Sequence, residues 1–262
     1  MIAILILASV LDAGPADKVA LRPEADIAIT AVGLAGFALP ELLKNQLAPE
    51  HCRVCGESLN GVDAFFHDHL TSWLVDRRTA DTISNVWVYA LLPIGGLVAA
   101  YTATGPFASD GAGVRAIGVV VEAVAVQGAL VQALKFTAAR QRPFARYGHG
   151  ETGGPYDLAD RDSHISMPSG HTGFATALGV SVAMTATLEE SRAAPWLWGA
   201  AAAATITTGS LRMMAEKHYF TDVLSGAAIG AACGVVFPLL HRRGSALSVG
   251  AQGPSVALSG AF

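Results

Sequence analysis

A histidine and an aspartate that stand four residues apart, His218 and Asp222, have the clearest potential for nucleophilic chemistry in this sequence. If both lie at the start of one helix, their side chains share a face. A carboxylate that accepts from one ring nitrogen fixes the tautomer and leaves the other nitrogen free to attack. Arg212 precedes the histidine and could hold an anion beside it. Polar residues that only end a membrane-spanning helix would give the same pattern.

The segment 167–172 reads Met-Pro-Ser-Gly-His-Thr and directly precedes an apolar run. A helix that begins here directs its free backbone N–H groups outward, and Gly170 lets an anion approach them closely. Ser169 adds a hydroxyl donor, and His171 can give a proton to a leaving group because imidazole titrates near neutral pH. An ordinary helix cap beside an incidental histidine would explain the same residues.

A third cluster consists of Lys135 and Arg142, the latter followed by Pro143, which stops a helix. The two cations could bind an anion, or they could only anchor a helix among lipid headgroups. Together with Arg212 they would suit a phosphate dianion, because phosphoryl transfer depends mainly on positioning and charge stabilisation.

The composition favours a membrane protein over a soluble one. Hydrophobic residues make up 52% of the chain and charged residues 15%, with a mean hydropathy of +0.44. The net charge of −4 leaves no broad cationic surface, which excludes nucleic acid as a partner on electrostatic grounds.

Six apolar stretches approach the roughly 20 residues that a helix needs to cross a bilayer. The sequence therefore predicts an all-α fold, a polytopic membrane helical bundle of about six transmembrane helices. If every stretch crosses, the three clusters lie on one membrane face, because antiparallel neighbours return to the same surface. The stretches are 27–43, 86–104, 114–134, 172–188, 195–208 and 223–240.

The remaining segments complete the expected organisation. Residues 1–25 form an N-terminal segment whose apolar run is either a secretory signal or an uncleaved membrane-associated end. Residues 26–243 form the membrane-embedded domain, with its catalytic core at about 114–240. The loop 44–82 contains an amphipathic stretch that predicts a helix at the membrane interface, and 244–262 is an irregular tail.

Two local features leave alternatives open. Cys52 and Cys55 predict a small disulfide or plain thiols, while the histidines nearby make zinc the alternative ligand. Glu122 lies in the middle of a span, where a charge is costly unless it is paired. We therefore expect it to pair inside the bundle. A catalytic role is not expected, because Glu122 lies about 20 Å along the helix from Lys135.

The three clusters resemble the signature motifs of the type 2 phosphatidic acid phosphatase superfamily, which includes bacterial acid phosphatases and vanadium haloperoxidases. The first motif stands as Lys135-Phe-Thr-Ala-Ala-Arg-Gln-Arg142-Pro143 and the second as Pro168-Ser169-Gly170-His171, both complete. The third runs from Leu211-Arg212 to His218 and Asp222, with leucine in place of the usual serine. This departure leaves every charged or nucleophilic position intact, so it bears on tuning more than on activity.

The resemblance implies a metal-independent reaction without a cofactor. His218 would attack phosphorus, Asp222 would orient it, and His171 would protonate the leaving alkoxide before water hydrolyses the phosphohistidine. The implied phosphate ligands are Lys135, Arg142, Ser169, Gly170 and Arg212.

Multi-span members of the family act on lipid phosphates, so the resemblance implies a phosphorylated lipid as substrate, either a phosphomonoester or a diphosphate, with membrane lipids as surroundings. The alternatives are a vanadate-dependent haloperoxidase and a catalytically silent membrane protein. Similar bacterial enzymes imply an inner membrane location with an extracytoplasmic active site, although basic residues divide almost evenly between the two faces. The loop 147–164, whose aspartates are expected to solvate it, would shape the mouth of the pocket.

Overall fold

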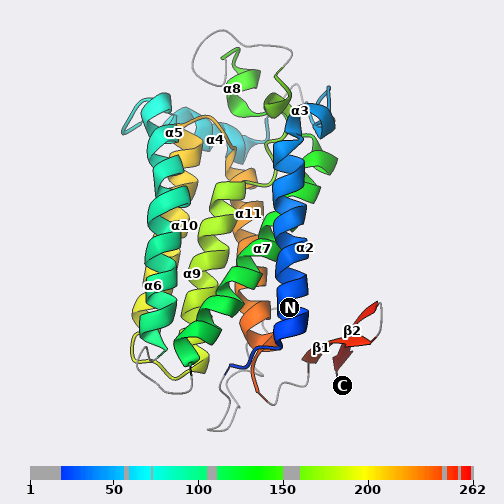
Figure 1. Ribbon diagram of the computed structural model, residues 1–262. Helices are drawn as coiled ribbons and strands as arrows, with labels where there is room; N and C mark the ends of the chain where they lie inside the picture. Colours follow the sequence, from blue (N-terminus) through cyan, green and yellow to red (C-terminus); the bar gives the residue numbers. More distant parts are fainter. Residues whose placement is uncertain are drawn as a thin grey trace.

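The computed structural model describes residues 19–55, 59–71, 73–104, 111–149, 160–243, 247–252 and 255–260. Most of the predicted N-terminal segment, residues 1–18, lies outside these ranges. The described chain is helical apart from two short strands (Figure 1). The long helices are α2 (Pro23–Leu42), α6 (Leu92–Ala103), α7 (Ala112–Ala138), α9 (Gly170–Leu188), α10 (Ala194–Met214) and α11 (Phe220–Leu240).

Shorter elements gather at one end of this bundle, where Figure 1 shows α3, α4, α5 and α8. Helix α5 continues into α6 through a π-helical turn, η1, so that 77–103 forms one long rod. The short elements are α3 (Lys44–Leu47), α4 (Gly61–Leu70), α5 (Arg77–Val86), η1 (Trp87–Leu91), α8 (Pro143–Arg146) and η2 (Arg161–His164).

Four helices are long and apolar enough to cross a membrane by length and composition: 23–42, 77–103, 112–138 and 220–240. All six predicted stretches are helical, but α9 and α10 do not reach this standard, so the predicted count of about six spans is not confirmed. The physical reason differs between them. Helix α9 lies in the bundle centre, where it packs on α7, α10 and α11 and buries hydroxyl side chains such as Thr172 and Ser181. Helix α10 contains a proline, two tryptophans, three threonines and a serine among its alanines, and these residues lower its mean hydropathy.

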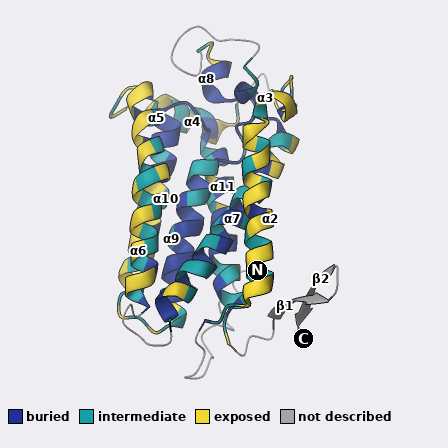
Figure 2. Ribbon diagram, viewed as in Figure 1, coloured by how far each residue is buried: buried dark blue, intermediate teal, exposed yellow. Residues whose placement is uncertain are grey.

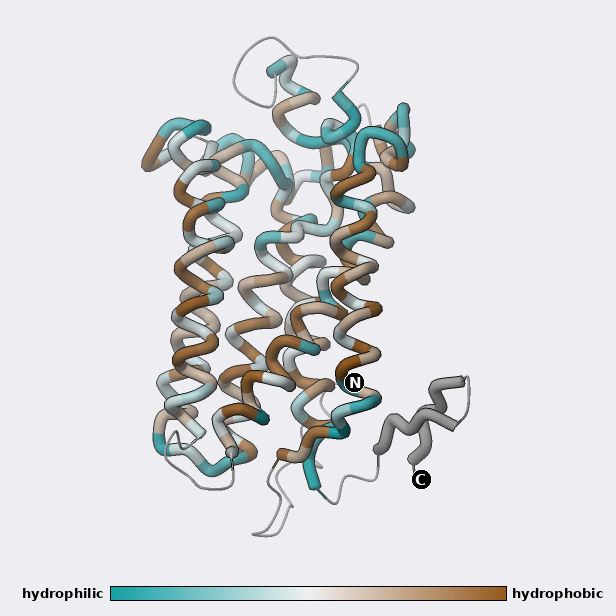
Figure 3. Tube along the Cα trace, in the orientation of Figure 1, coloured by the Kyte–Doolittle hydropathy of each residue, from teal (hydrophilic) through white to brown (hydrophobic). Residues whose placement is uncertain are grey.

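Burial follows the same arrangement. Figure 2 shows α9 largely buried, whereas α2 and α6 present long exposed stripes. These stripes are apolar (Figure 3) and include Val32 and Ile94, which are 72% and 65% exposed. Apolar side chains on the outside and hydroxyls on the inside are the pattern expected of a bundle whose surroundings are lipid.

Small residues let α9 and α11 approach closely. A side chain at Gly226 would collide with the backbone carbonyl of Ser169, and one at Gly230 would collide with that of Gly173. This close crossing fixes the start of α9, where the second predicted cluster lies, against the start of α11, where the third lies.

Helix α4 confirms that the amphipathic stretch of the loop is helical. Asn60 caps it by accepting from the backbone N–H groups of Val62 and Asp63. The helix packs on α10 and α11 and crosses the end of the bundle (Figure 1). Cys52 and Cys55 form a disulfide, which leaves no thiolate for the zinc alternative.

The tail was predicted to be irregular, and this is wrong for its described part. Strands β1 (Leu247–Gln252) and β2 (Ser255–Gly260) pair antiparallel. The apolar alternation along the tail is too weak to predict a strand, whereas backbone groups that find no helical partner gain hydrogen bonds by pairing.

Candidate active site

The three predicted clusters meet at the end of the bundle that carries the short helices. They surround a cavity of about 560 Å³ between α2, α5, α7, α9 and α10. Ser169 and Asp222 lie behind the cavity wall and are fully buried. The predicted residues that line the cavity are Lys135, Arg142, Gly170, His171, Arg212 and His218.

The backbone around each cluster explains this convergence. Helix α7 ends at Ala139, whose left-handed conformation, with φ of 46°, turns the chain away from the helix axis. The chain then crosses the end of the bundle, and the N–H of Arg142 donates to the Ser163 carbonyl. Ser169 caps α9 by accepting from the N–H of Thr172. Its own N–H donates to the Asp222 carbonyl, which joins α9 to α11.

His218 presents one ring nitrogen to the cavity. Its Nδ1 lies 2.7 Å from the carbonyl oxygen of Ser166, so that an Nδ1–H donates there. Its Nε2 lies 3.5 Å from a guanidinium nitrogen of Arg142. With Nδ1 as the donor, Nε2 carries the lone pair, and it faces the cations of the cavity.

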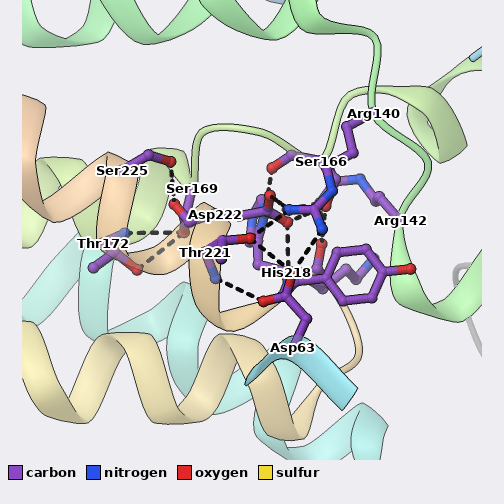
Figure 4. A network of polar contacts seen from close by, with 12 residues as sticks. Asp63, Arg140, Arg142, Ser166, Ser169, Thr172, His218, Thr221, Asp222 and Ser225 are labelled. Atoms are coloured by element: carbon purple, nitrogen blue, oxygen red, sulfur yellow. Dashed lines mark hydrogen bonds and ion pairs between the residues drawn. The ribbon is translucent and has the colours of Figure 1, made fainter. Parts of the chain in front are cut away.

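The hydrogen bond expected between Asp222 and His218 is not formed directly, because Oδ2 of Asp222 lies 3.9 Å from Nδ1. Ser166 stands between them. Its hydroxyl donates to Oδ2 of Asp222 at 2.6 Å, while its carbonyl accepts from His218 (Figure 4). The aspartate therefore acts on the ring through a serine that the sequence motifs do not include.

Asp222 is held in turn by Arg140, whose guanidinium donates to it at 2.5 Å. The same guanidinium donates at 2.7 Å to Asp63 of α4 (Figure 4). Asp63 is fully buried and also accepts from the N–H and the hydroxyl of Thr221. Burial by itself raises the pKa of Asp63, but the hydrogen bonds from Arg140 and Thr221 outweigh it and hold that pKa below its usual value.

The electrostatic setting keeps His218 neutral. Burial lowers its pKa well below the usual value, and the nearby cations Arg142 and Arg212 lower it further. A neutral imidazole has a free lone pair near neutral pH, which is the state that a nucleophile requires.

His171 is positioned by a residue outside the three motifs. Its Nε2 lies 2.8 Å from the side-chain oxygen of Asn85, at the end of α5, and its ring makes a T-shaped contact with Tyr89 of η1. Asn85 fixes the ring at the cavity wall by accepting its proton. Asn85 immediately precedes the second apolar stretch, and nothing in its local spacing signals a partner 86 residues away.

Carboxylates hold the two arginines in place. Arg142 pairs with Asp162 at 3.1 Å, and Arg212 pairs with Asp81 at 2.7 Å. Burial tends to raise the pKa of Asp162, but Arg142 and Lys44 overcome this and lower it, so that Asp162 is ionised. The expectation that this aspartate only solvates its loop is therefore wrong.

Lys135 differs from the arginines. Within the described ranges it forms no ion pair, so its ammonium group is available to an anion. A Cβ atom on Gly170 would lie 3.4 Å from its Nζ, so the absence of a side chain there keeps the space beside the ammonium open. Two more lysines that the sequence motifs do not include, Lys44 and Lys217, also line the cavity.

Part of the cavity wall is apolar. Leu34 and Phe37 of α2, Val88 of η1 and Phe174 of α9 line it. One compartment therefore joins a cationic end to an apolar region between the helices, which suits a ligand with an anionic head and an apolar body.

The comparison with known families agrees with this geometry. Residues 116–245 match the PAP2 superfamily, whose members are generally phosphatases, and all eight predicted site residues fall within the matched segment. No curated protein and no solved structure matches the chain. The chain therefore belongs to the PAP2 superfamily through the segment that builds its cationic cavity.

Proposed function

We propose that this protein hydrolyses the phosphate ester or diphosphate of a membrane lipid through a phosphohistidine formed on His218, without a metal ion or cofactor. The observation that carries the proposal is the neutral His218, whose Nε2 faces a cavity lined by Lys135, Arg142 and Arg212. Fixed cations around a nucleophile stabilise the charge of a phosphoryl group during transfer.

The two chemical steps balance as follows. Nε2 of His218 forms a bond to phosphorus while the bond to the lipid oxygen breaks. His171 enters this step as the imidazolium, keeps its Nε2–H on Asn85 and gives the lipid oxygen the proton of Nδ1. Water then attacks the phosphohistidine and gives a proton to His171, which releases phosphate and restores both histidines. Asn85 supports this role because it keeps the ring of His171 at the cavity wall in both steps.

The apolar wall of the cavity favours a lipid over a soluble ester. Leu34 and Phe37 continue the cavity along α2, and Leu34 is 50% exposed on that helix, where lipid would surround it. An acyl or prenyl chain could lie against these residues while its phosphate reaches the cations. A water-soluble phosphate would leave this surface unused.

We also propose that α9 and α10 cross the membrane with the four candidate spans, which gives six in all. The two helices have 19 and 21 residues and lie side by side with the others in the bundle (Figure 1). A bacterial inner membrane with the cavity on its extracytoplasmic face fits this arrangement, because the disulfide between Cys52 and Cys55 lies at the same end.

The test is phosphate release from a panel of lipid monophosphates and diphosphates in detergent micelles, with p-nitrophenyl phosphate as a soluble comparison. We expect the wild type to prefer lipids and His218→Ala to lose at least about a thousandfold in kcat. His69→Ala serves as the matched control, because that histidine is exposed on α4. Full activity in His218→Ala would refute the mechanism.

A haloperoxidase would behave differently. It would oxidise bromide when loaded with vanadate and would hydrolyse phosphate esters poorly. We expect vanadate to inhibit phosphate release competitively, because it resembles the transferred phosphoryl group, and we expect no bromide oxidation.

A further inference from the structure

Three side chains converge at the end of the bundle opposite the cavity. They are Asp26 in the first turn of α2, Glu122 of α7 and His241, which follows α11. Nε2 of His241 lies 3.1 Å from Oδ1 of Asp26 and 3.1 Å from Oε2 of Glu122. Figure 1 shows that α2 begins and α11 ends at this end of the molecule. The expectation that Glu122 pairs inside the bundle is confirmed.

The outer atoms of two of these side chains are already engaged. Nδ1 of His241 donates to the carbonyl of Phe237 at 2.8 Å, and Oδ2 of Asp26 accepts from the N–H of Arg22 at 2.5 Å. The inner atoms, Nε2 and Oδ1, are therefore the ones that point at each other. An imidazole whose other nitrogen donates to a backbone carbonyl is the usual arrangement of a metal ligand.

Glu122 gives an independent indication of a missing ligand. Its side chain is 1% exposed, and within the described part of the chain its Oε2 has no hydrogen-bond partner. The atom is ion-paired with Nε2 of His241 at 3.1 Å, but the geometry of this contact leaves Oε2 without a hydrogen bond. A buried carboxylate oxygen in this state is costly, and it points into the space that Asp26 and His241 also face.

We propose that Asp26, Glu122 and His241 bind a divalent cation of the zinc class. Bonds of about 2.0 Å in a tetrahedral site separate neighbouring ligand atoms by roughly 3.3 Å, which is close to the two distances of 3.1 Å found here. One imidazole nitrogen with carboxylate oxygens suits zinc better than magnesium, which prefers oxygen ligands alone.

The site would serve structure rather than catalysis. It joins the start of α2, the middle of α7 and the end of α11, and the N–H of Ala20 donates to the carbonyl of His241 beside it. Glu122 lies 13 residues before Lys135 on α7, which is about 20 Å along the helix. A cation here would hold the three helices together without reaching the reacting groups.

The test uses the full chain, purified in detergent, stripped with a chelator and titrated with zinc chloride. We expect about one zinc ion per chain by elemental analysis and a rise in Tm of about 5 °C. Glu122→Gln and Asp26→Asn should lose both effects, because each replaces a carboxylate with an amide of the same size. Glu24→Gln, which alters an exposed carboxylate of the same helix, should retain both.

Two results would overturn the proposal. One is a wild type that binds no stoichiometric zinc and shows no change in Tm, which would leave a protonated His241 between two carboxylates. The other is zinc that remains bound in Asp26→Asn, the variant with the smaller buried change, because the metal would then lie elsewhere. Phosphate release is measured on the same samples, so that loss of catalysis with zinc retained bears on the proposed function alone.

Discussion

At the residue scale, the side chains that orient His218 form a chain of contacts rather than a single pair. Asp63 accepts from Arg140, and Arg140 donates to Asp222. Asp222 accepts from the hydroxyl of Ser166, and the backbone carbonyl of Ser166 accepts from Nδ1 of His218. Asp63, Asp222, Ser166 and His218 are buried, and the side chain of Arg140 is 11% exposed, so these hydrogen bonds act in a medium where charge interactions are stronger than in water. The orientation of the nucleophile therefore depends on α4, an element outside the matched family segment.

We expect Asp63→Asn to lower kcat about tenfold while KM changes little. The neutral amide cannot balance the positive charge of Arg140. The substitution therefore weakens the contact between Arg140 and Asp222 without changing a residue of the cavity. A purely structural defect would lower the amount of folded protein and leave kcat per folded molecule unchanged. Asp68→Asn, on the exposed side of the same helix, is the control that should keep kcat. An unaltered kcat in Asp63→Asn would exclude a positioning role.

The residues that sequence reasoning missed share one property. The motif residues were found because a resemblance links their types and spacing to a reaction. Arg140 and Asn85 give no such signal, because their partners lie 82 and 86 residues away and are brought close only by the fold. The local pattern around an arginine or asparagine does not reveal whether the fold will bring it to a catalytic group.

At the element scale, apolar stretches located every long helix, since a helix in lipid must be apolar over about 20 residues. They did not locate the ends. Helix α5 extends the second stretch back to Arg77, and α10 continues to Met214, because polar residues at a helix end are satisfied by tertiary contacts such as that of Arg212 with Asp81. Paired polar residues are invisible to a hydropathy pattern.

The crossing of α9 and α11 provides a test of close packing. We expect Gly226→Ala to lower Tm by at least about 5 °C, because the added methyl group meets the carbonyl of Ser169 and must push the helices apart. Gly199→Ala is the matched control, since nothing lies within 4 Å of a Cβ at that helical position. It should be neutral or stabilising, as alanine favours a helix. Equal Tm values for both variants would contradict this packing.

Helix α4 is also fastened by a contact that depends on pH. His67 pairs with Glu216, in the loop between α10 and α11, at 3.2 Å. Burial lowers the pKa of His67, but the hydrogen bonds to Glu216 and Asp68 overcome this and raise it above 6.5. A raised pKa means that the folded state binds the proton more tightly. This stabilisation is therefore complete below about pH 6.5, while Glu216 stays ionised, and is lost as pH rises through the raised pKa.

His67→Gln measures this contribution, because glutamine can keep a hydrogen bond but not the charge. We expect the variant to melt about 2 °C below the wild type at pH 6 and at nearly the same temperature at pH 9. His69→Gln, exposed on the same helix, controls for the loss of a histidine. A Tm difference that is independent of pH would show that packing, rather than charge, fastens the helix.

At the scale of the whole molecule, the two ends of the bundle have different chemistry. One end carries the cationic cavity, the disulfide and α4, and the other carries the convergence of Asp26, Glu122 and His241. A disulfide persists on the oxidising side of a membrane. If the helices cross six times, as we propose, the end of α11 returns to the side on which α2 begins. The proposed orientation, with the cavity outside and Arg242 and Arg243 in the cytoplasm, agrees with both arguments, because basic residues are favoured on the cytoplasmic side.

A reporter fused after Arg243 tests this orientation. We expect a fluorescent protein that matures only in the cytoplasm to be bright there, and alkaline phosphatase, which needs oxidised disulfides, to be inactive at the same junction. The two reporters give opposite readings, so poor expression of one cannot imitate the result. Active alkaline phosphatase after Arg243 would mean that the chain is inverted or crosses an odd number of times, and the cavity would then open toward cytoplasmic lipid phosphates. The orientation thus decides which membrane leaflet can supply the substrate.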